Sequence, residues 1–131
     1  MSARYLSDDW FAAVAALGAE LPEIDGLDAV VDIEVAGSPD GKVRYHEVWN
    51  SGRLVEVASG KAEASDVQFV FKYPDAVAHV RGDIADDVAF MQGRFKIDGA
   101  YERWLYEFRP VVGSESYRAF RESVAQSTDF D

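Results

Sequence analysis

Four stretches typical of β-strands follow one another between residues 29 and 72, and only turn-forming sequences separate them. In the first stretch, valine and isoleucine alternate with acidic residues, which is the pattern of a strand with one buried face. The expected strands span Ala29 to Ala36, Lys42 to Asn50, Arg53 to Ala58 and Val67 to Phe71. A parallel doubly wound fold needs long helical crossovers between successive strands, and these spacers leave no room for them. The sequence therefore predicts a mostly antiparallel sheet.

Helical spacing of apolar residues marks the segments on both sides of these strands. Ser7 is suited to cap a first helix that buries Trp10, Phe11 and Val14 and ends near Gly18. Five further elements are expected: a helix from Pro74 to Gly82, a helix capped by Asp83 or Asp86 that ends at Gly93, a strand from Arg94 to Asp98, a helix from Tyr101 to Phe108, and a helix that starts at Ser114 with Tyr117, Phe120 and Val124 facing inward. The tail from Ser127 to Asp131 is expected to fray.

The order of these elements predicts an α+β fold. Because strands come first and helices afterwards, a five-stranded, mostly antiparallel sheet with helices gathered on one face is the expected architecture. The length of 131 residues suits one domain, and no linker or internal repeat divides it, so residues 1–131 are interpreted as a single domain.

Charge and composition narrow the classes of partner. The net charge is −11, and residues 1–93 carry 7 basic against 17 acidic side chains, a balance that repels nucleic-acid phosphates and anionic membranes. Nucleic acid is therefore not an expected partner. Four cations near the other end could form a local membrane-contact patch or be ordinary solvated charges: Arg94, Lys96, Arg103 and Arg109.

Compartment and cofactors are constrained by what the sequence lacks. No apolar run is long enough to span a bilayer and residues 1–9 lack a leader pattern, so the cytoplasm is the expected location. There is no cysteine, and His46 and His79 lie on different elements without clustered carboxylates, so no metal site is expected. No phosphate-loop, dinucleotide or hydrolase-elbow motif occurs, and no cofactor is expected.

Residues 86–108, with the sequence DDVAFMQGRFKIDGAYERWLYEF, resemble part of a known family. In the sterol carrier protein type 2 family, a phenylalanine-bearing helix leads through a Gln-Gly turn into a short strand, a glycine and an amphipathic helix. The matching residues here are Phe90, Gln92, Gly93, Phe95, Lys96, Ile97 and Gly99. The order of elements upstream agrees as well, and the resemblance covers about residues 5–125.

The resemblance implies a sheet and helices that enclose an apolar tunnel for sterols, fatty acids or fatty acyl-CoA esters. The family's lining positions are mostly apolar and are carried over by place in the motif. They are Phe90, Met91, Phe95 and Ile97, with Trp104, Leu105 and Phe108 on the helix that follows. The strand from Lys42 to Asn50 departs from a purely apolar lining, because it is rich in aromatic and polar residues.

The strands supply further candidate wall residues. Tyr45, Trp49, Phe69 and Phe71 are suited to line an apolar cavity, although an ordinary core is built from the same residue types. Alternation also places Glu47 on the face of Tyr45 and Trp49, where a carboxylate could orient a ligand hydroxyl or act as a base. The alternative for Glu47 is an edge strand or bulge that turns it to water. Tyr45 and Tyr101 could donate hydrogen bonds into the cavity or be interfacial phenols.

Three functions remain in competition. The leading hypothesis is a noncatalytic carrier that holds an apolar ligand and delivers it to a lipid-metabolising enzyme or, by transient contact, to a membrane. The second is an enzyme that uses Glu47, His46 or Tyr45 as acid or base on an apolar substrate in the same cavity. The third is an interaction domain, which predicts a solid core together with a large exposed apolar patch.

Overall fold

A five-stranded sheet forms the centre of the computed structural model, which describes residues 3–24, 27–81, 95–99 and 114–130, with residues 95–99 described by their backbone. The strands lie in the order β4-β3-β2-β5-β6. Their bounds are β2 Ala29–Ser38, β3 Gly41–Asn50, β4 Arg53–Ser59, β5 Val67–Lys72 and β6 Phe95–Gly99. Every neighbouring pair is antiparallel except β2 with β5. The prediction of an α+β fold with a mostly antiparallel sheet is confirmed.

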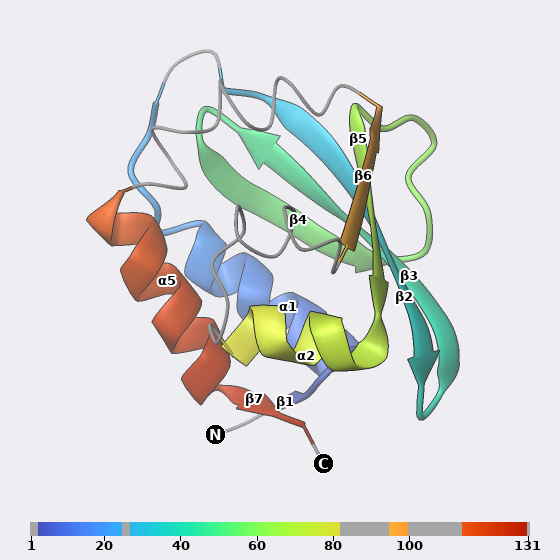
Figure 1. Cartoon of the computed structure of the whole chain (residues 1–131). Coiled ribbons are helices and arrows are strands. Elements are labelled where there is room, and N and C mark those ends of the chain that lie inside the picture. The colour runs from blue at the N-terminus through green and yellow to red at the C-terminus, as the bar shows by residue number, and fades with distance from the viewer. Residues whose placement is uncertain (1–2, 25–26, 82–94, 100–113, 131) are drawn as a thin grey trace.

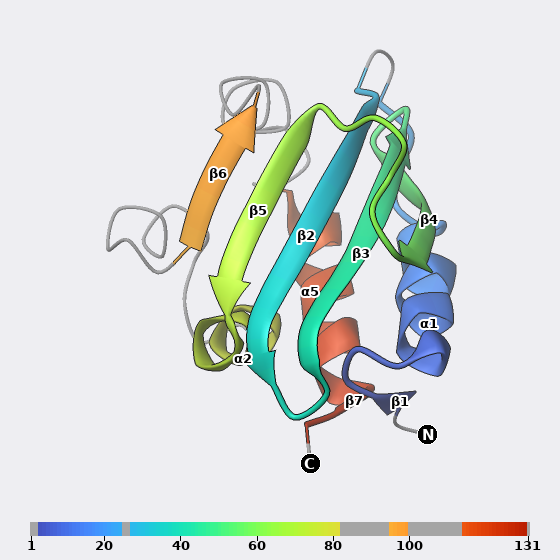
Figure 2. The same ribbon diagram turned by 90° about the vertical axis from the view of Figure 1, so that its right-hand side faces the viewer.

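The parallel pair arises from the path of the chain. Strands β2, β3 and β4 follow one another by tight turns, and the chain then returns past β3 so that β5 lies on the other side of β2 (Figure 2). Residues 60–66 make this return along the face of the sheet opposite the helices. The Ala62 amide donates to Asp32 Oδ1 over 2.8 Å, and the Asp66 amide donates to the Val30 carbonyl over 2.8 Å. These bonds tie the return segment to β2.

Three described helices cover one face of the sheet, as predicted (Figure 2). They are α1 Asp8–Gly18, α2 Tyr73–Arg81 and α5 Glu115–Gln126. The side chains of Ser7 and Ser114 cap α1 and α5 by accepting from the amides of Trp10 and Tyr117. Since these serines fix where the helices start, the apolar residues predicted to face inward do so, and Trp10, Phe11, Val14, Tyr117 and Val124 are buried.

The end of the chain corrects one prediction. Residues Thr128–Asp129 form β7, which pairs in parallel with β1, Ala3–Arg4, so the tail does not fray (Figure 1). The Tyr5 amide donates to the Asp129 carbonyl over 2.8 Å. Thr128 is buried, and its hydroxyl accepts a 2.9 Å hydrogen bond from Trp10 Nε1 and donates to the Val124 carbonyl. These bonds join the end of α5 to α1.

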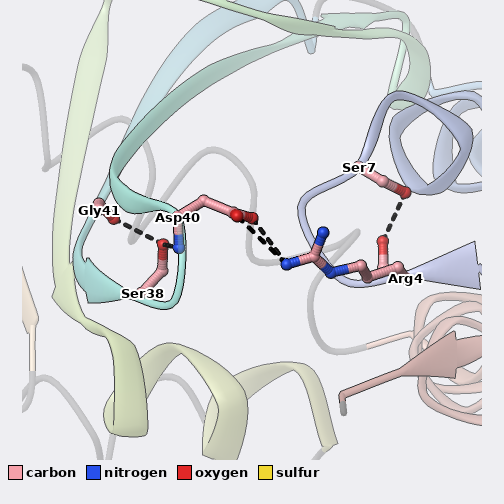
Figure 3. Close-up of polar contacts among 5 residues, drawn as sticks. All are labelled: Arg4, Ser7, Ser38, Asp40 and Gly41. Carbon is pink, nitrogen blue, oxygen red and sulfur yellow. Dashed lines mark hydrogen bonds and ion pairs between the residues drawn. The ribbon is translucent and has the colours of Figure 1, made fainter.

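A second contact links β1 to the turn between β2 and β3. Arg4 Nη2 lies 3.0 Å from Asp40 Oδ2, and Ser38 Oγ donates to the Gly41 carbonyl within the turn (Figure 3). The ion pair is more than half exposed on both sides, so water screens it and its contribution to stability is small. The β1–β7 pair is therefore held mainly by backbone bonds and by buried side chains beneath it.

Two predicted helices lie outside the described residues, namely the one capped by Asp83 or Asp86 that ends at Gly93 and the one from Tyr101 to Phe108. The predicted strand at Arg94–Asp98 corresponds to β6, whose backbone pairs with β5. None of the helices in the described part of the chain is long and apolar enough to cross a membrane.

We expect Thr128→Val to lower the free energy of unfolding by about 1–3 kcal/mol, because it leaves the buried Trp10 indole N–H without its acceptor. The measurement is urea denaturation followed by tryptophan fluorescence. Thr128→Ser keeps the hydroxyl and serves as the matched control, with a smaller loss expected. Equal stability of the valine variant and the native chain would show that this hydrogen bond does not anchor the tail.

Candidate functional site

A cavity of about 60 Å³ lies between the inner face of the sheet and the helices. Residues of β2, β3 and β5 form one wall, and residues of α1, α2 and α5 form the other. The lining residues are Trp10, Val14, Ile33, Tyr45, Glu47, Trp49, Phe69, Phe71, His79, Val80, Tyr117, Phe120, Arg121 and Val124. Most of them are aromatic or aliphatic, as in sites that bury apolar small molecules.

Strand alternation builds the sheet wall. In β3, Tyr45, Glu47 and Trp49 point to the helix side because side chains two residues apart share a face. The register places Tyr45 opposite Ile33 of β2, and Ile33 in turn beside Phe69 of β5. The aromatic residues of neighbouring strands therefore form one continuous surface under the helices.

Helix α5 builds much of the opposite wall. Tyr117, Phe120, Arg121 and Val124 recur at positions i, i+3, i+4 and i+7, which is the spacing of one helix face. The Tyr117 ring lies 6.4 Å from the Trp49 ring and 5.8 Å from the Phe120 ring, measured between centroids. These contacts bring α5 onto the end of β3, with the cavity between them.

Arg121 is held by α2 on this wall. Its Nη2 donates to the His79 carbonyl, and its Nη1 lies 3.5 Å from His79 Nδ1. The His79 ring stacks at a tilt on Phe71, with 5.3 Å between ring centroids. The guanidinium is half-buried among aromatic residues, and it is fixed by contacts from a second helix.

Glu47 is a half-buried carboxylate on the sheet wall. Trp49 Nε1 donates to Glu47 Oε1 over a long distance of 3.4 Å. A register shift does occur in the pairing of β3 with β4, but it falls between Val48 and Trp49, after Glu47. Glu47 therefore stays on the cavity side, and the alternative in which a bulge turns it to water is not what the structure has.

Tyr45 is a buried phenol on the same wall, with rings of Trp10 and Phe11 packed against it at centroid distances of 5.7 and 5.0 Å. Burial raises the pKa of Tyr45 well above its usual value, and the nearby Tyr5 and Glu47 add to this rise while Arg121 opposes it. The phenol is therefore a neutral donor rather than a base. Within the described part of the chain, its hydroxyl makes no hydrogen bond.

His46 lies on the other face of the sheet. Its Nδ1 is 2.8 Å from the Gly60 carbonyl in the return segment, and its Nε2 is 3.7 Å from the Glu56 carboxylate. The enzyme hypothesis drew on His46 for the same cavity as Tyr45 and Glu47. The structure corrects this for His46, because the alternation of β3 separates it from both.

The predicted ligand-binding residues fall into three groups. Tyr45, Glu47, Trp49, Phe69 and Phe71 come together around the cavity. The backbones of Phe95 and Ile97 pair with those of Phe71 and Phe69 in β6 and β5. The remaining predictions lie outside the described residues: Phe90, Met91, Tyr101, Trp104, Leu105 and Phe108.

Sequence reasoning missed His79 and Arg121 as cavity residues. The helical spacing that predicted Tyr117, Phe120 and Val124 as inward-facing also places Arg121 on that face, one residue after Phe120. The spacing was therefore a usable signal for Arg121, although the sequence analysis named only the apolar residues of this face. In the described ranges, no group of three histidine or acidic side chains is arranged to hold a metal ion.

Comparison with known proteins identifies the fold. No protein-family model and no curated protein matches the chain. Among solved structures, a crystal structure of sterol carrier protein 2 is similar over 91% of this chain and 98% of its own, with a TM-score of 0.70 and 14% identity. A conserved hypothetical protein from Thermus thermophilus is similar over 95% of this chain and 93% of its own, with a TM-score of 0.65 and 13% identity.

The palmitated sterol carrier protein 2-like 2 of Aedes aegypti is also similar, over 87% of this chain and 96% of its own, with a TM-score of 0.61 and 17% identity. At such identities the likeness concerns the fold. The chain has the fold of sterol carrier protein 2, as the motif at residues 86–108 predicted.

Stability should fall at high pH because of two buried phenols. Burial raises the pKa of both Tyr5 and Tyr45 above the value of about 10 that they have when unfolded. Above pH 10 the unfolded chain releases these protons while the native chain keeps them, so rising pH favours unfolding by about 1.4 kcal/mol per pH unit for each tyrosine. Below about pH 10 both the folded and the unfolded chain keep these protons, so the two tyrosines cause no loss of stability there.

The measurement is the free energy of unfolding by urea between pH 9 and 11, in the native chain and in Tyr45→Phe. Tyr5 and Tyr45 together make the free energy of unfolding fall as pH rises above 10. Tyr45→Phe should remove about half of their joint contribution to this fall. An identical slope in both proteins would mean that Tyr45 titrates in the folded state as it does in the unfolded state.

Proposed function

We propose that this chain binds a long apolar molecule of the sterol, fatty-acid or fatty-acyl-CoA class in the cavity between the sheet and the helices, and that it acts as a noncatalytic carrier in the cytoplasm. The observation that supports this most directly is a partly open cavity with aromatic walls, built mainly by β3, β5 and α5. Burying apolar ligand surface there contributes about 25 cal/mol per Å². A structural neighbour that is palmitated adds support from outside this chain.

The size of the cavity sets a condition on binding. The space of about 60 Å³ is well below the roughly 300–1,000 Å³ of pockets that take drug-sized molecules. It holds on the order of four water molecules. A sterol or a long acyl chain therefore fits only if the cavity widens or extends past the described side chains.

The competing functions have less support. The enzyme hypothesis loses His46 to the other face of the sheet, and Tyr45 stays protonated, so of its three residues Glu47 is the one left to act as a base in the cavity. The interaction-domain hypothesis expects a solid core and a large exposed apolar patch. Across the described residues, Val55 is the large aliphatic residue that stands exposed, and a single residue makes no patch.

The first experiment is native mass spectrometry of freshly purified protein, followed by organic extraction and identification of what is released. A stoichiometric sterol, fatty acid or acyl-CoA supports the carrier and names its ligand. The proposal is contradicted if the purified protein carries no bound lipid and also fails to take up fluorescent lipid analogues. Transfer to acceptor vesicles or to a lipid-metabolising enzyme is then measured with the identified ligand.

A substitution that fills the cavity should block binding. Val80 is buried on α2 and lines the space, so we expect Val80→Phe to weaken the binding of a fluorescent fatty-acid analogue at least tenfold, because the added ring occupies ligand volume. Val55→Phe adds the same ring on an exposed position of β4 and should bind normally. Thermal unfolding of both variants confirms that they fold. Unchanged binding by folded Val80→Phe would place the ligand elsewhere.

A further inference from the structure

A second pocket lies at the end of the molecule where β1 and β7 pair, and we call it the end pocket. It has a volume of about 70 Å³ and is bordered by β1, the turn between β2 and β3, the start of α2 and the segment that includes β7. Among the described residues, none that lines the end pocket also lines the cavity between the sheet and the helices. The two spaces are therefore separate sites.

Aromatic rings form one wall of the end pocket. The ring centroid of Tyr5 lies 6.1 Å from that of Tyr73 and 5.4 Å from that of Phe130, and all three residues line the space. Tyr5 is buried, whereas Tyr73 and Phe130 are half-buried and keep part of their surface open. Aromatic rings pack well in offset or edge-to-face contact with other rings. This wall is suited to a planar ring.

Arg4 brings hydrogen-bond donors that are still available to a ligand. Its guanidinium reaches from β1 to the turn between β2 and β3, where Nη2 donates to both carboxylate oxygens of Asp40 over 3.2 and 3.0 Å (Figure 3). Among the described residues, its Nε and Nη1 donate to no acceptor. A guanidinium has five N–H donors, so a ligand can accept from Arg4 while the ion pair stays in place.

The acceptors that line the end pocket are already in use. The Asp40 carboxylate accepts from Arg4, and the Ser38 hydroxyl accepts from the Asp40 amide while it donates to the Gly41 carbonyl. Asp129 is not without a partner either. The groups that remain for a ligand are therefore mainly donors, and the ligand atom that meets them is an acceptor.

Leu6 holds a costly backbone conformation on the wall of this pocket. Its φ is +68°, in the left-handed region that residues other than glycine rarely adopt. The Ser7 amide and the Ser7 hydroxyl both donate to the Arg4 carbonyl, over 3.0 and 2.6 Å, and close the turn that holds Leu6 this way (Figure 3). Such strain persists where the surrounding structure imposes it, and it is frequent at ligand sites.

The charges at this end are balanced, although the chain as a whole carries −11. The guanidinium of Arg81 lies 5.1 Å over the Phe130 ring and adds a second positive charge to that of Arg4. Together the two arginines offset the acidic residues of the lining, Asp40 and Asp129. Acidic residues farther away act weakly here, because physiological salt screens exposed charges beyond about 8 Å. An anion can therefore approach the end pocket.

We propose that the end pocket binds a small aromatic carboxylate, whose ring packs on Tyr73 and Phe130 while its carboxylate accepts from Arg4. A charged acceptor makes stronger hydrogen bonds to a guanidinium than a neutral acceptor does. The volume of about 70 Å³ holds on the order of five water molecules, which limits the ligand to a single ring. This site goes beyond the proposed function, and neither depends on the other.

The test compares three ligands that separate the ring from the charge. Sodium benzoate, sodium acetate and benzyl alcohol are titrated at pH 7 into the full-length chain, and the amide shifts are followed by nitrogen-15 NMR. Acetate lacks the ring, and benzyl alcohol lacks the charge. We expect benzoate to bind at least fivefold more tightly than either, and to shift the amides of Tyr5, Leu6 and Tyr73.

Two substitutions break the same ion pair and should change the affinity in opposite directions. Arg4→Gln removes the charged donor and should weaken benzoate at least fivefold. Asp40→Asn leaves the guanidinium in place, frees it from its partner and removes a negative charge, so it should strengthen benzoate several-fold. A merely structural role of the ion pair would make both variants change in the same direction.

Two controls show that the effect belongs to this pocket. Arg44→Gln breaks another exposed ion pair, in which Arg44 Nε lies 3.0 Å from Glu34 Oε1, and Arg44 lines neither space. Val80→Phe fills the cavity between the sheet and the helices. Both variants should bind benzoate as the native chain does. Thermal unfolding is recorded for every variant to confirm that it folds.

The proposal is overturned if benzoate does not bind, or if acetate or benzyl alcohol binds as tightly. It is also overturned if Arg4→Gln and Asp40→Asn change the affinity in the same direction, or if Val80→Phe abolishes benzoate binding, which places benzoate in the other cavity. None of these results decides whether the chain carries a lipid. That is measured separately, and Arg4→Gln should take up a fluorescent fatty-acid analogue as the native chain does.

Discussion

The position of α5 over the sheet depends on how the two ends of the chain meet. The indole of Trp10 on α1 donates to Thr128, directly after α5, and the short β1–β7 pair adds backbone bonds beside it. Figure 1 shows α1, α5 and this pair gathered at one end of the molecule. Since α5 carries much of the helix wall, these bonds help to position that side of the cavity.

The position of α5 also explains why the cavity has both apolar and charged walls. Helix α5 presents aromatic residues to the sheet on one face, and Arg121 shares that face. Its charge is tolerable there because α2 supplies a carbonyl oxygen from His79, and hydrogen bonds to charged groups are the strong ones. The helix that forms much of this wall thus also places a cation on the lining of the cavity, which it shares with the neutral phenol of Tyr45 on β3.

The periodic spacing of apolar residues predicted most of the helices and strands. It could not predict contacts between segments that are far apart in the sequence. Alternation located β2, β3 and β5, and serine caps located α1 and α5, because these signals lie within one element. The β1–β7 pair joins dipeptides about 125 residues apart, so neither strand is long enough to show a period. Arg121 was missed for a related reason, since its burial depends on a partner in another helix.

The alternation of side chains along β3 decides which polar groups face the cavity. Tyr45 and Glu47 face the cavity, while His46 between them faces the return segment and contacts Gly60. Three residues that are adjacent in sequence and suited to acid–base catalysis are thereby divided between two sides of the sheet. Among the described residues, the cavity is lined by a phenol that keeps its proton, the carboxylate of Glu47 and, from α2 and α5, the side chains of His79 and Arg121. This one-residue step therefore leaves His46 unable to act together with Tyr45 and Glu47 on one molecule in the cavity.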